Sequence, residues 1–284
     1  MRSGLVIVAA AFTTIGAPLH AQAESDWTAP GWVGDVTFLS LNALSGGLTA
    51  GLFQKLRGES FTDGFARGAL GGSVYYAGLR MTAQRFDGAG LIGRQLAATG
   101  TSMVRNAADG RPALERLFVP LGPLHLYIDR AAGFAVRPKV NVAALTVLLS
   151  AVAEPRLHWD AGATFSAGAP VFRAPGRRIL NDGETRGGYA HAGSMFISDM
   201  GPEHDPLILA HERVHVVQGD WLFLAWSEPV EAWLMSRIPG GAALYRYVDI
   251  AFVVPSVGGT LYDLLHISDA NRLYEIEAYF LDSR

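Results

Sequence analysis

The chain has 284 residues, of which 50% are hydrophobic and 17% are charged, and its formal net charge is −3. It has no basic stripe that could neutralise a run of phosphates, so the composition excludes nucleic acid as a partner. The absence of cysteine excludes a thiol nucleophile and any cysteine-ligated metal. Chemistry must therefore come from histidine, carboxylate and hydroxyl groups, in a chain long enough to bury a sizeable core.

Residues 1–23 have the pattern of an export signal. Arg2 supplies a positive charge, an apolar run follows from Leu5 to Ile15, and Ala21 and Ala23 place small residues before a cut at Glu24. The apolar run is too short to span about 30 Å of hydrocarbon, which argues against a permanent anchor. We expect an exported protein that is periplasmic, envelope-associated or secreted.

Residues 36–83 predict a tightly packed helical hairpin. Val36 to Gln54 carry no charge, and Ser60 followed by Asp63 is typical of the N-terminal cap of a second helix. A glycine inside a helix costs about 1 kcal/mol relative to alanine, so several in register need a close partner. The two helices offer matching small-residue stripes, which are Gly64, Gly68 and Gly72 against Ala43, Gly47 and Gly51.

Polar residues lower the hydrophobicity of the first helix of this hairpin, and the second helix carries charged residues. A soluble or surface-docked hairpin is therefore favoured over a membrane span. Peripheral membrane association stays open. Residues 84–112 are rich in Gly, Asn and Asp and are expected to be a loop that ends an N-terminal region of residues 24–112. Within that segment Gly88, Gly90 and Gly93 have the spacing of the glycines in a dinucleotide-binding motif. They follow a predicted helix and not a strand, so no nucleotide site is predicted.

Residues 113–284 form the second region, which we expect to pack with the first as one compact unit. Between residues 115 and 173 the hydrophobic pattern changes to period two, which predicts antiparallel strands at 125–129, 139–142 and 156–160, with a further strand at 194–197. His125 and His158 alternate within these strands and are interpreted as structural. The predicted fold class is α+β.

The segment Leu207–Trp221 carries the motif with the clearest chemistry. His211 and His215 are one helical turn apart, so both imidazoles can reach one Zn²⁺ at about 2.0–2.1 Å. Glu212 stays close enough to act as general base toward a zinc-bound water, whose pKa the metal lowers to about 7. Arg213 is unusual at a position that is normally uncharged, and we expect it to be exposed or paired.

Zinc needs a third protein ligand, and several carboxylates are available. Glu228 and Glu231 lie close in sequence, at the start of a helix that Pro229 suggests. A C-terminal helix from about Ala270 to Leu281, capped by Ser268 or Asp269, carries Glu275 and Glu277, of which one at most can face a metal. Periodicity places Glu277 toward the core, together with the apolar positions Leu273, Ile276 and Phe280.

The histidine motif followed by a helix with Glu-x-Glu-Ala resembles the zincin metallopeptidases, and most closely their CAAX-prenyl-protease-like branch. The resemblance covers these two segments and also extends, through Gln218, to poorly characterised exported bacterial proteins. It implies that Glu275 is the third ligand and that Ala278 lets the two helices approach. The family's aspartate position is Tyr279 here, and Asp282 is the substitute one turn on. It also implies that strand 193–198 binds substrate backbone.

The sequence thus predicts an exported zinc-dependent hydrolase acting on a peptide or protein. His266 and Tyr262 are weaker candidates for stabilising an oxyanion, and His204 is interpreted as solvated. An aromatic cluster after the motif is expected to pack in the core, namely Trp221, Phe223, Trp226 and Trp233. Two alternatives remain: a non-catalytic envelope binding or assembly protein, and a membrane-associated protein with incidental histidines.

Overall fold

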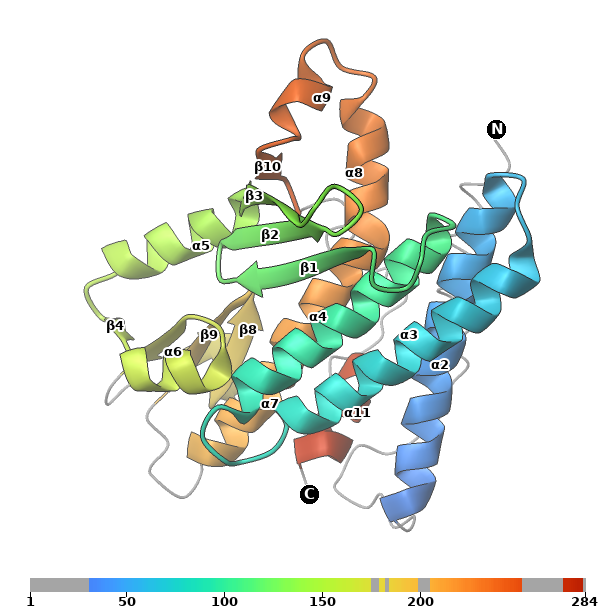
Figure 1. Cartoon of the computed structure of the whole chain (residues 1–284). Coiled ribbons are helices and arrows are strands. Elements are labelled where there is room, and N and C mark those ends of the chain that lie inside the picture. The colour runs from blue at the N-terminus through green and yellow to red at the C-terminus, as the bar shows by residue number, and fades with distance from the viewer. Residues whose placement is uncertain (1–30, 175–178, 182–183, 199–204, 252–272, 283–284) are drawn as a thin grey trace.

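The structure is a computed structural model that describes residues 31–174, 179–181, 184–198, 205–251 and 273–282. The predicted signal segment lies outside the described residues, as do His204, Tyr262, His266, Ser268 and Asp269. Within the described parts the fold is α+β, as the sequence predicted: helices pack beside two small four-stranded sheets (Figure 1).

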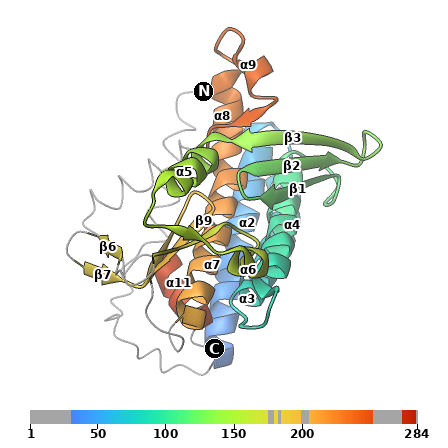
Figure 2. The same cartoon turned by 90° about the vertical axis from the view of Figure 1, so that its left-hand side faces the viewer.

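Three long helices form the N-terminal part and lie side by side in both views (Figures 1 and 2). They are α2 (Gly31–Leu56), α3 (Phe61–Thr82) and α4 (Ala89–Ala108). The predicted hairpin of α2 and α3 is confirmed, and Ser60 caps α3 by accepting a hydrogen bond from the backbone N–H of Asp63 at 3.3 Å. The first helix begins five residues earlier than the pattern of uncharged residues suggested.

Close backbone contact holds the hairpin together. A Cβ placed on Gly68 would lie 2.6 Å from the Cβ of Ala50 and closer still to the carbonyl oxygen of Gly46. Gly72 faces Asn42 and Ala43 in the same way. The glycines of α3 therefore contact a stripe of α2 that passes through Gly46 and Ala50, which is rotated slightly from the predicted one.

The prediction of a loop over residues 84–112 is wrong, because α4 occupies most of it. Glycine lowers intrinsic helix propensity, but here Gly93 and Gly100 let α4 lie directly against the backbone of α3 at Thr82 and Tyr75. Gly88 adopts φ 85° at the position before the helix, where a residue without Cβ is favoured. The glycines that imitate a nucleotide-binding loop thus serve a turn and helix packing.

The first sheet has the order β1-β2-β3-β10, with three antiparallel strands and β10 parallel to β3. Its strands are β1 (Arg116–Leu121), β2 (Leu124–Asp129), β3 (Ala135–Asn141) and β10 (Val248–Asp249). The second sheet has the order β4-β5-β9-β8, and β5 runs parallel to β9. Its strands are β4 (His158–Trp159), β5 (Val171–Ala174), β8 (Gly188–His191) and β9 (Ser194–Ser198). A hairpin of β6 (Ile179–Asn181) and β7 (Glu184–Arg186) stands apart.

The expectation of antiparallel strands throughout residues 115–173 is therefore only partly right. Two helices interrupt them, α5 (Val142–Ala153) and α6 (Ala161–Ala167). Both begin at a capping side chain, because Asn141 and Asp160 each accept a hydrogen bond from a backbone N–H three residues on. The sequence of α5 is a continuous apolar run, and periodicity alone does not distinguish a buried strand from a helix in such a run.

The C-terminal part is built on one long helical rod. The rod consists of α7 (Asp205–Leu222), a π-helical turn η1 (Phe223–Ser227) and α8 (Glu228–Met235). Two separate helices follow later in the chain, α9 (Gly241–Leu244) and α11 (Leu273–Asp282). Trp221, Phe223 and Trp226 are buried as expected, whereas Trp233 is 48% exposed because it lies beyond the core on α8. One hydrophobic core joins α2, α3 and α4 to α7, η1 and α11.

Candidate metal centre

The two motif histidines lie together on α7, because a spacing of four residues puts them on one face of the helix. Their Nε2 atoms are 3.0 Å apart, and the two ring planes stand at 84° to each other. The structure places α11 across this face. Ala278 on α11 is completely buried, which is what the zincin resemblance implied for the alanine beside the third ligand.

Glu275 completes the group. Its Oε2 lies 3.3 Å from Nε2 of His211 and 3.2 Å from Nε2 of His215. Ligand atoms bound at about 2.0–2.1 Å to a tetrahedral ion are about 3.3 Å from one another, so the three atoms have the mutual spacing of zinc ligands. Among the described residues, these three form the one group of His, Asp and Glu side chains close enough to hold a metal ion.

The electrostatics of Glu275 suit a ligand. Burial alone would raise the pKa of its carboxyl, but hydrogen bonds and charge from His211 and His215 outweigh burial and lower the pKa to about 2. The carboxylate is therefore ionised over the ordinary pH range, which metal binding requires. The three side chains are between 12% and 15% exposed, so solvent reaches each of them.

Glu277 is not part of this group. Its side chain is buried, and it accepts hydrogen bonds from Nε2 of Gln218 at 3.0 Å and from Nδ2 of Asn42 at 2.6 Å. Burial raises its pKa above the usual range. The periodicity argument thus placed Glu277 correctly in the core, and the preference for Glu275 at the metal agrees with the geometry.

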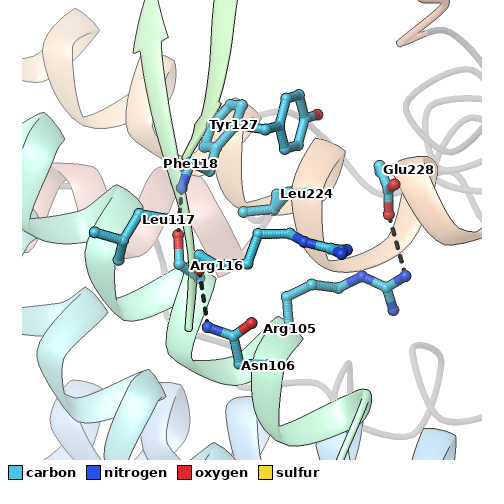
Figure 3. Close-up of a pocket in the computed structure, with 9 residues that line it drawn as sticks. Arg105, Asn106, Arg116, Leu117, Phe118, Tyr127, Leu224 and Glu228 are labelled. Carbon is cyan, nitrogen blue, oxygen red and sulfur yellow. Dashed lines mark hydrogen bonds and ion pairs between the residues drawn. The ribbon is translucent and has the colours of Figure 1, made fainter. Parts of the chain in front are cut away.

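The other two candidate ligands face elsewhere. Glu228 pairs with Arg105 at 3.2 Å and lines a pocket between α4, β1 and η1 (Figure 3). Glu231 is buried and accepts hydrogen bonds from the backbone N–H groups of Ile250 and Ala251 at 3.2 and 3.1 Å. It fixes the chain after β10 and, among the described residues, belongs to no group that could hold a metal ion.

Glu212 follows His211 on α7 and is 5% exposed. Its side chain passes β8 at Gly188, where an added Cβ would lie 3.2 Å from the Cγ of Glu212. The missing side chain of Gly188 thus leaves room for this carboxylate between α7 and the sheet.

Of the two expected states, exposed or paired, the structure shows the second: Arg213 is buried, and its guanidinium donates to the hydroxyl of Ser166 at 3.1 Å and to the carbonyl of Gln84 at 3.5 Å. It points away from the metal face and joins α7 to α6 and to the end of α3. Desolvation lowers its pKa below the usual value.

Comparison with protein-family models, with curated proteins and with solved structures finds no match for this chain. The resemblance to zincin peptidases therefore stays a prediction, and only the arrangement of these side chains supports a metal centre.

The predicted role of strand 193–198 in binding substrate is wrong in its location. β9 is buried and is paired on both sides, with β5 and with β8, so its backbone cannot accept another strand. The end strand of this sheet is β8, which lies beside α7. Of the two predicted structural histidines, His125 is buried beside Asp249, whereas His158 is exposed on β4.

Sequence reasoning missed two polar residues that support the group, Gln218 and Asn42. Gln218 lies three residues after His215, and its Oε1 is 2.8 Å from Nδ1 of that histidine. Asn42 comes from α2, 235 positions before Glu277. The spacing of Gln218 from His215 could have suggested a contact on the helix surface, but no local signal connects Asn42 with the C-terminal helix.

Proposed function

We propose that the protein is an exported zinc-dependent hydrolase of the metallopeptidase class. The observation that carries the proposal is the triangle of His211, His215 and Glu275, whose facing atoms are 3.0, 3.2 and 3.3 Å apart. Two neutral imidazoles and one carboxylate leave a fourth position open on a tetrahedral ion, which is the donor set of catalytic zinc sites.

The proposed chemistry divides between the ion and the chain. Zinc bound by these residues supplies a Lewis acid that polarises a carbonyl group and acidifies water. Glu212 accepts the proton of the attacking water and returns it to the leaving amine. Its burial between α7 and β8 limits competing hydrogen bonds from solvent. The exposed backbone of an extended peptide would pair with β8, because that strand ends the sheet beside α7.

The test separates metal binding from turnover. The purified mature protein should contain one zinc ion per chain by elemental analysis and should hydrolyse peptides from a diverse pool, as mass spectrometry of the products would show. Glu212→Gln should keep the metal and lose roughly 10²–10⁴-fold in rate, which is the usual contribution of a general base. Glu228→Gln is the matched control on the same helical rod and should change neither metal content nor rate.

Two outcomes would contradict the proposal. Hydrolysis that persists in Glu212→Gln would remove this residue from the mechanism. Wild-type protein that binds zinc stoichiometrically yet cleaves no peptide would favour the non-catalytic envelope protein instead.

Peripheral membrane association is a second proposal, and it concerns where the protein works. Among the described helices α2 is the one long and apolar enough to cross a membrane, and only 33% of its most apolar window is buried. Large apolar side chains are exposed along its N-terminal half, namely Trp32, Val36, Leu39 and Leu44. The other face of α2 packs on α3, which favours docking to a bilayer surface over a full span.

A further inference from the structure

The amide of Gln218 contacts both helices that carry the proposed ligands. Its Oε1 lies 2.8 Å from Nδ1 of His215 on α7. Its Nε2 donates to the backbone carbonyl of Tyr274 and to Oε2 of Glu277, both at 3.0 Å and both on α11. Gln218 is 8% exposed, so these contacts are sheltered from water.

The carbonyl of Tyr274 decides which way the amide points. A backbone carbonyl can only accept a hydrogen bond, so the NH₂ group of Gln218 must face α11 and its oxygen must face His215. That oxygen can only accept, and therefore Nδ1 of His215 carries the proton. When the imidazole is neutral, as a metal ligand must be, it is thus the tautomer whose Nε2 has a lone pair, and that Nε2 faces His211 and Glu275.

The same amide fixes the position of the carboxylate ligand. Tyr274 directly precedes Glu275, and Glu277 lies two residues after it, so the two hydrogen bonds from Gln218 hold α11 by a backbone carbonyl before Glu275 and by a side-chain carboxylate after it. One side chain therefore controls the orientation of one ligand and the approach of another.

Asn42 extends this support to the N-terminal hairpin. Its Nδ2 donates to the carbonyl of Phe38 at 2.9 Å and to Oε1 of Glu277 at 2.6 Å. The carbonyl of Phe38 can only accept, so the NH₂ group of Asn42 is the part of the amide that faces Phe38 and Glu277. Asn42 and Gln218 therefore both donate to the Glu277 carboxylate, each to a different oxygen. The chain of contacts runs from α2 through Glu277 on α11 to Gln218 and His215 on α7.

We infer that Gln218 is a positioning residue of the metal centre, and that Asn42 acts through Glu277 to keep it in place. The inference depends on the proposed metal site. It goes beyond that site because it makes metal affinity depend on α2, a helix that supplies none of the three ligands. Residues that orient a metal-binding histidine typically change affinity 10–100-fold when removed.

The experiment measures metal binding in the full mature chain, without any assay of hydrolysis. Zinc affinity is measured by competition with a chelating dye, and Co²⁺ is titrated in parallel because its visible spectrum reports ligand geometry. Gln218→Leu should bind zinc roughly 10–100-fold more weakly and change the cobalt spectrum. Asn42→Leu should weaken binding in the same direction and by less, because Tyr274 still anchors the Gln218 amide.

The control is Gln54→Leu. Gln54 is also a buried glutamine that donates to a backbone carbonyl, that of Ala107, but it lies on the far end of the hairpin. This variant should keep the wild-type affinity and cobalt spectrum even where it lowers thermal stability. Equal loss of affinity in Gln54→Leu would mean that general destabilisation explains the effect, and it would overturn the inference.

The remaining outcomes are also decisive. Wild-type affinity and spectrum in Gln218→Leu would overturn the inference while leaving the metal centre intact. Should Gln218→Leu not fold, Asn42→Leu carries the test alone, and wild-type affinity in that variant would refute the role of α2. A wild-type chain that binds neither zinc nor cobalt would remove the metal centre itself.

Discussion

One buried carboxylate of the first sheet is satisfied by groups from distant parts of the chain. Asp249 is completely buried, and it contacts Nδ1 of His125 at 2.8 Å, the hydroxyl of Tyr127 at 3.0 Å and Nζ of Lys139 at 2.9 Å. Burial by itself raises the pKa of Asp249, but the hydrogen bond with His125 and the charge of Lys139 lower it below the usual range. This network joins β10 to β2 and β3.

The lowered pKa of Asp249 makes stability depend on acidity. A carboxyl whose pKa is lower in the folded state contributes stability above its unfolded pKa of about 3.9, and that stability is lost as the pH falls through the folded value. Asp249→Asn should therefore cost about 3–5 kcal/mol near pH 7, since it leaves the Lys139 ammonium without its buried partner. The difference from wild type should shrink below about pH 4.

Urea unfolding of both proteins at pH 6.5 and at pH 3 measures this difference. A difference that stays the same at both pH values would show that the Asp249 carboxylate contributes through packing and not through its charge.

At the proposed metal centre, the sequence predicted the residues whose spacing is set by one helix. His211 and His215 need only the helical repeat to come together. Glu275 was chosen because the zincin resemblance places the third ligand three residues before a small alanine, Ala278, at which the two helices contact each other. The contacts that Gln218 and Asn42 make with α11, and the burial of Arg213, could not be predicted, because each depends on how elements far apart in the sequence pack together. Tertiary contacts of this kind leave no periodic trace in the sequence.

Glycine stripes decide how closely the helices approach. The sequence predicted the α2–α3 hairpin because glycines spaced by four stood in both segments. It did not predict α4, because glycine and polar residues lower helix propensity there and the compensating contact with α3 is not local. In the structure α3 is sandwiched, with Gly68 facing Ala50 on α2 and Gly78 facing Ala97 on α4.

A pair of alanine substitutions tests this account of packing. Gly68→Ala gains helix propensity worth about 1 kcal/mol, but its Cβ would come within 2.6 Å of the Cβ of Ala50 and even closer to a backbone carbonyl of α2. Overpacking of this kind typically costs about 1–3 kcal/mol, so we expect net destabilisation. In Gly219→Ala the added Cβ meets nothing within 4 Å on the exposed side of α7, and we expect stabilisation of about 0.5–1 kcal/mol.

Thermal unfolding of the two variants beside wild type gives the comparison. Shifts of the same sign would contradict the packing argument, because helix propensity acts alike at both sites and only the neighbouring backbone differs.

The protein's two regions share one structure. The hydrophobic core unites α2, α3 and α4 with α7 and α11, and a buried ion pair between Arg94 and Asp220, with Nε and Oδ2 2.6 Å apart, joins α4 to α7. The N-terminal hairpin therefore supports directly the helices that carry the proposed ligands, as the contact of Phe280 with Gly34 also indicates. Because α2 shares one core with α7 and α11, a membrane to which α2 docks would lie at a fixed distance and orientation from the proposed metal centre.

The exposed apolar side of α2 leads to a prediction about membranes. Trp32 and Val36 are 69% and 54% exposed, and Leu39, which is 39% exposed, lies on the same side of the helix by the helical repeat. Transfer of such side chains out of water stabilises by about 25 cal/mol per Å² of apolar surface, so the mature protein should sediment with phospholipid vesicles. The combined substitution Val36→Ser and Leu39→Ser should weaken that binding at least several-fold without lowering zinc content.

The matched control changes equally exposed apolar residues on α5, which lies on the opposite side of the molecule from α2 (Figure 1). Leu149 and Val152 are 59% and 67% exposed, so their replacement by serine removes a similar apolar area from another face. If α2 is the docking surface, only the α2 variant loses vesicle binding. Apolar side chains stabilise the bound state only where they leave water for the bilayer, and those of α5 would stay in water. Equal losses in both variants would indicate nonspecific hydrophobic adhesion, and wild-type protein that stays in solution would leave the hairpin with a purely structural role in supporting α7 and α11.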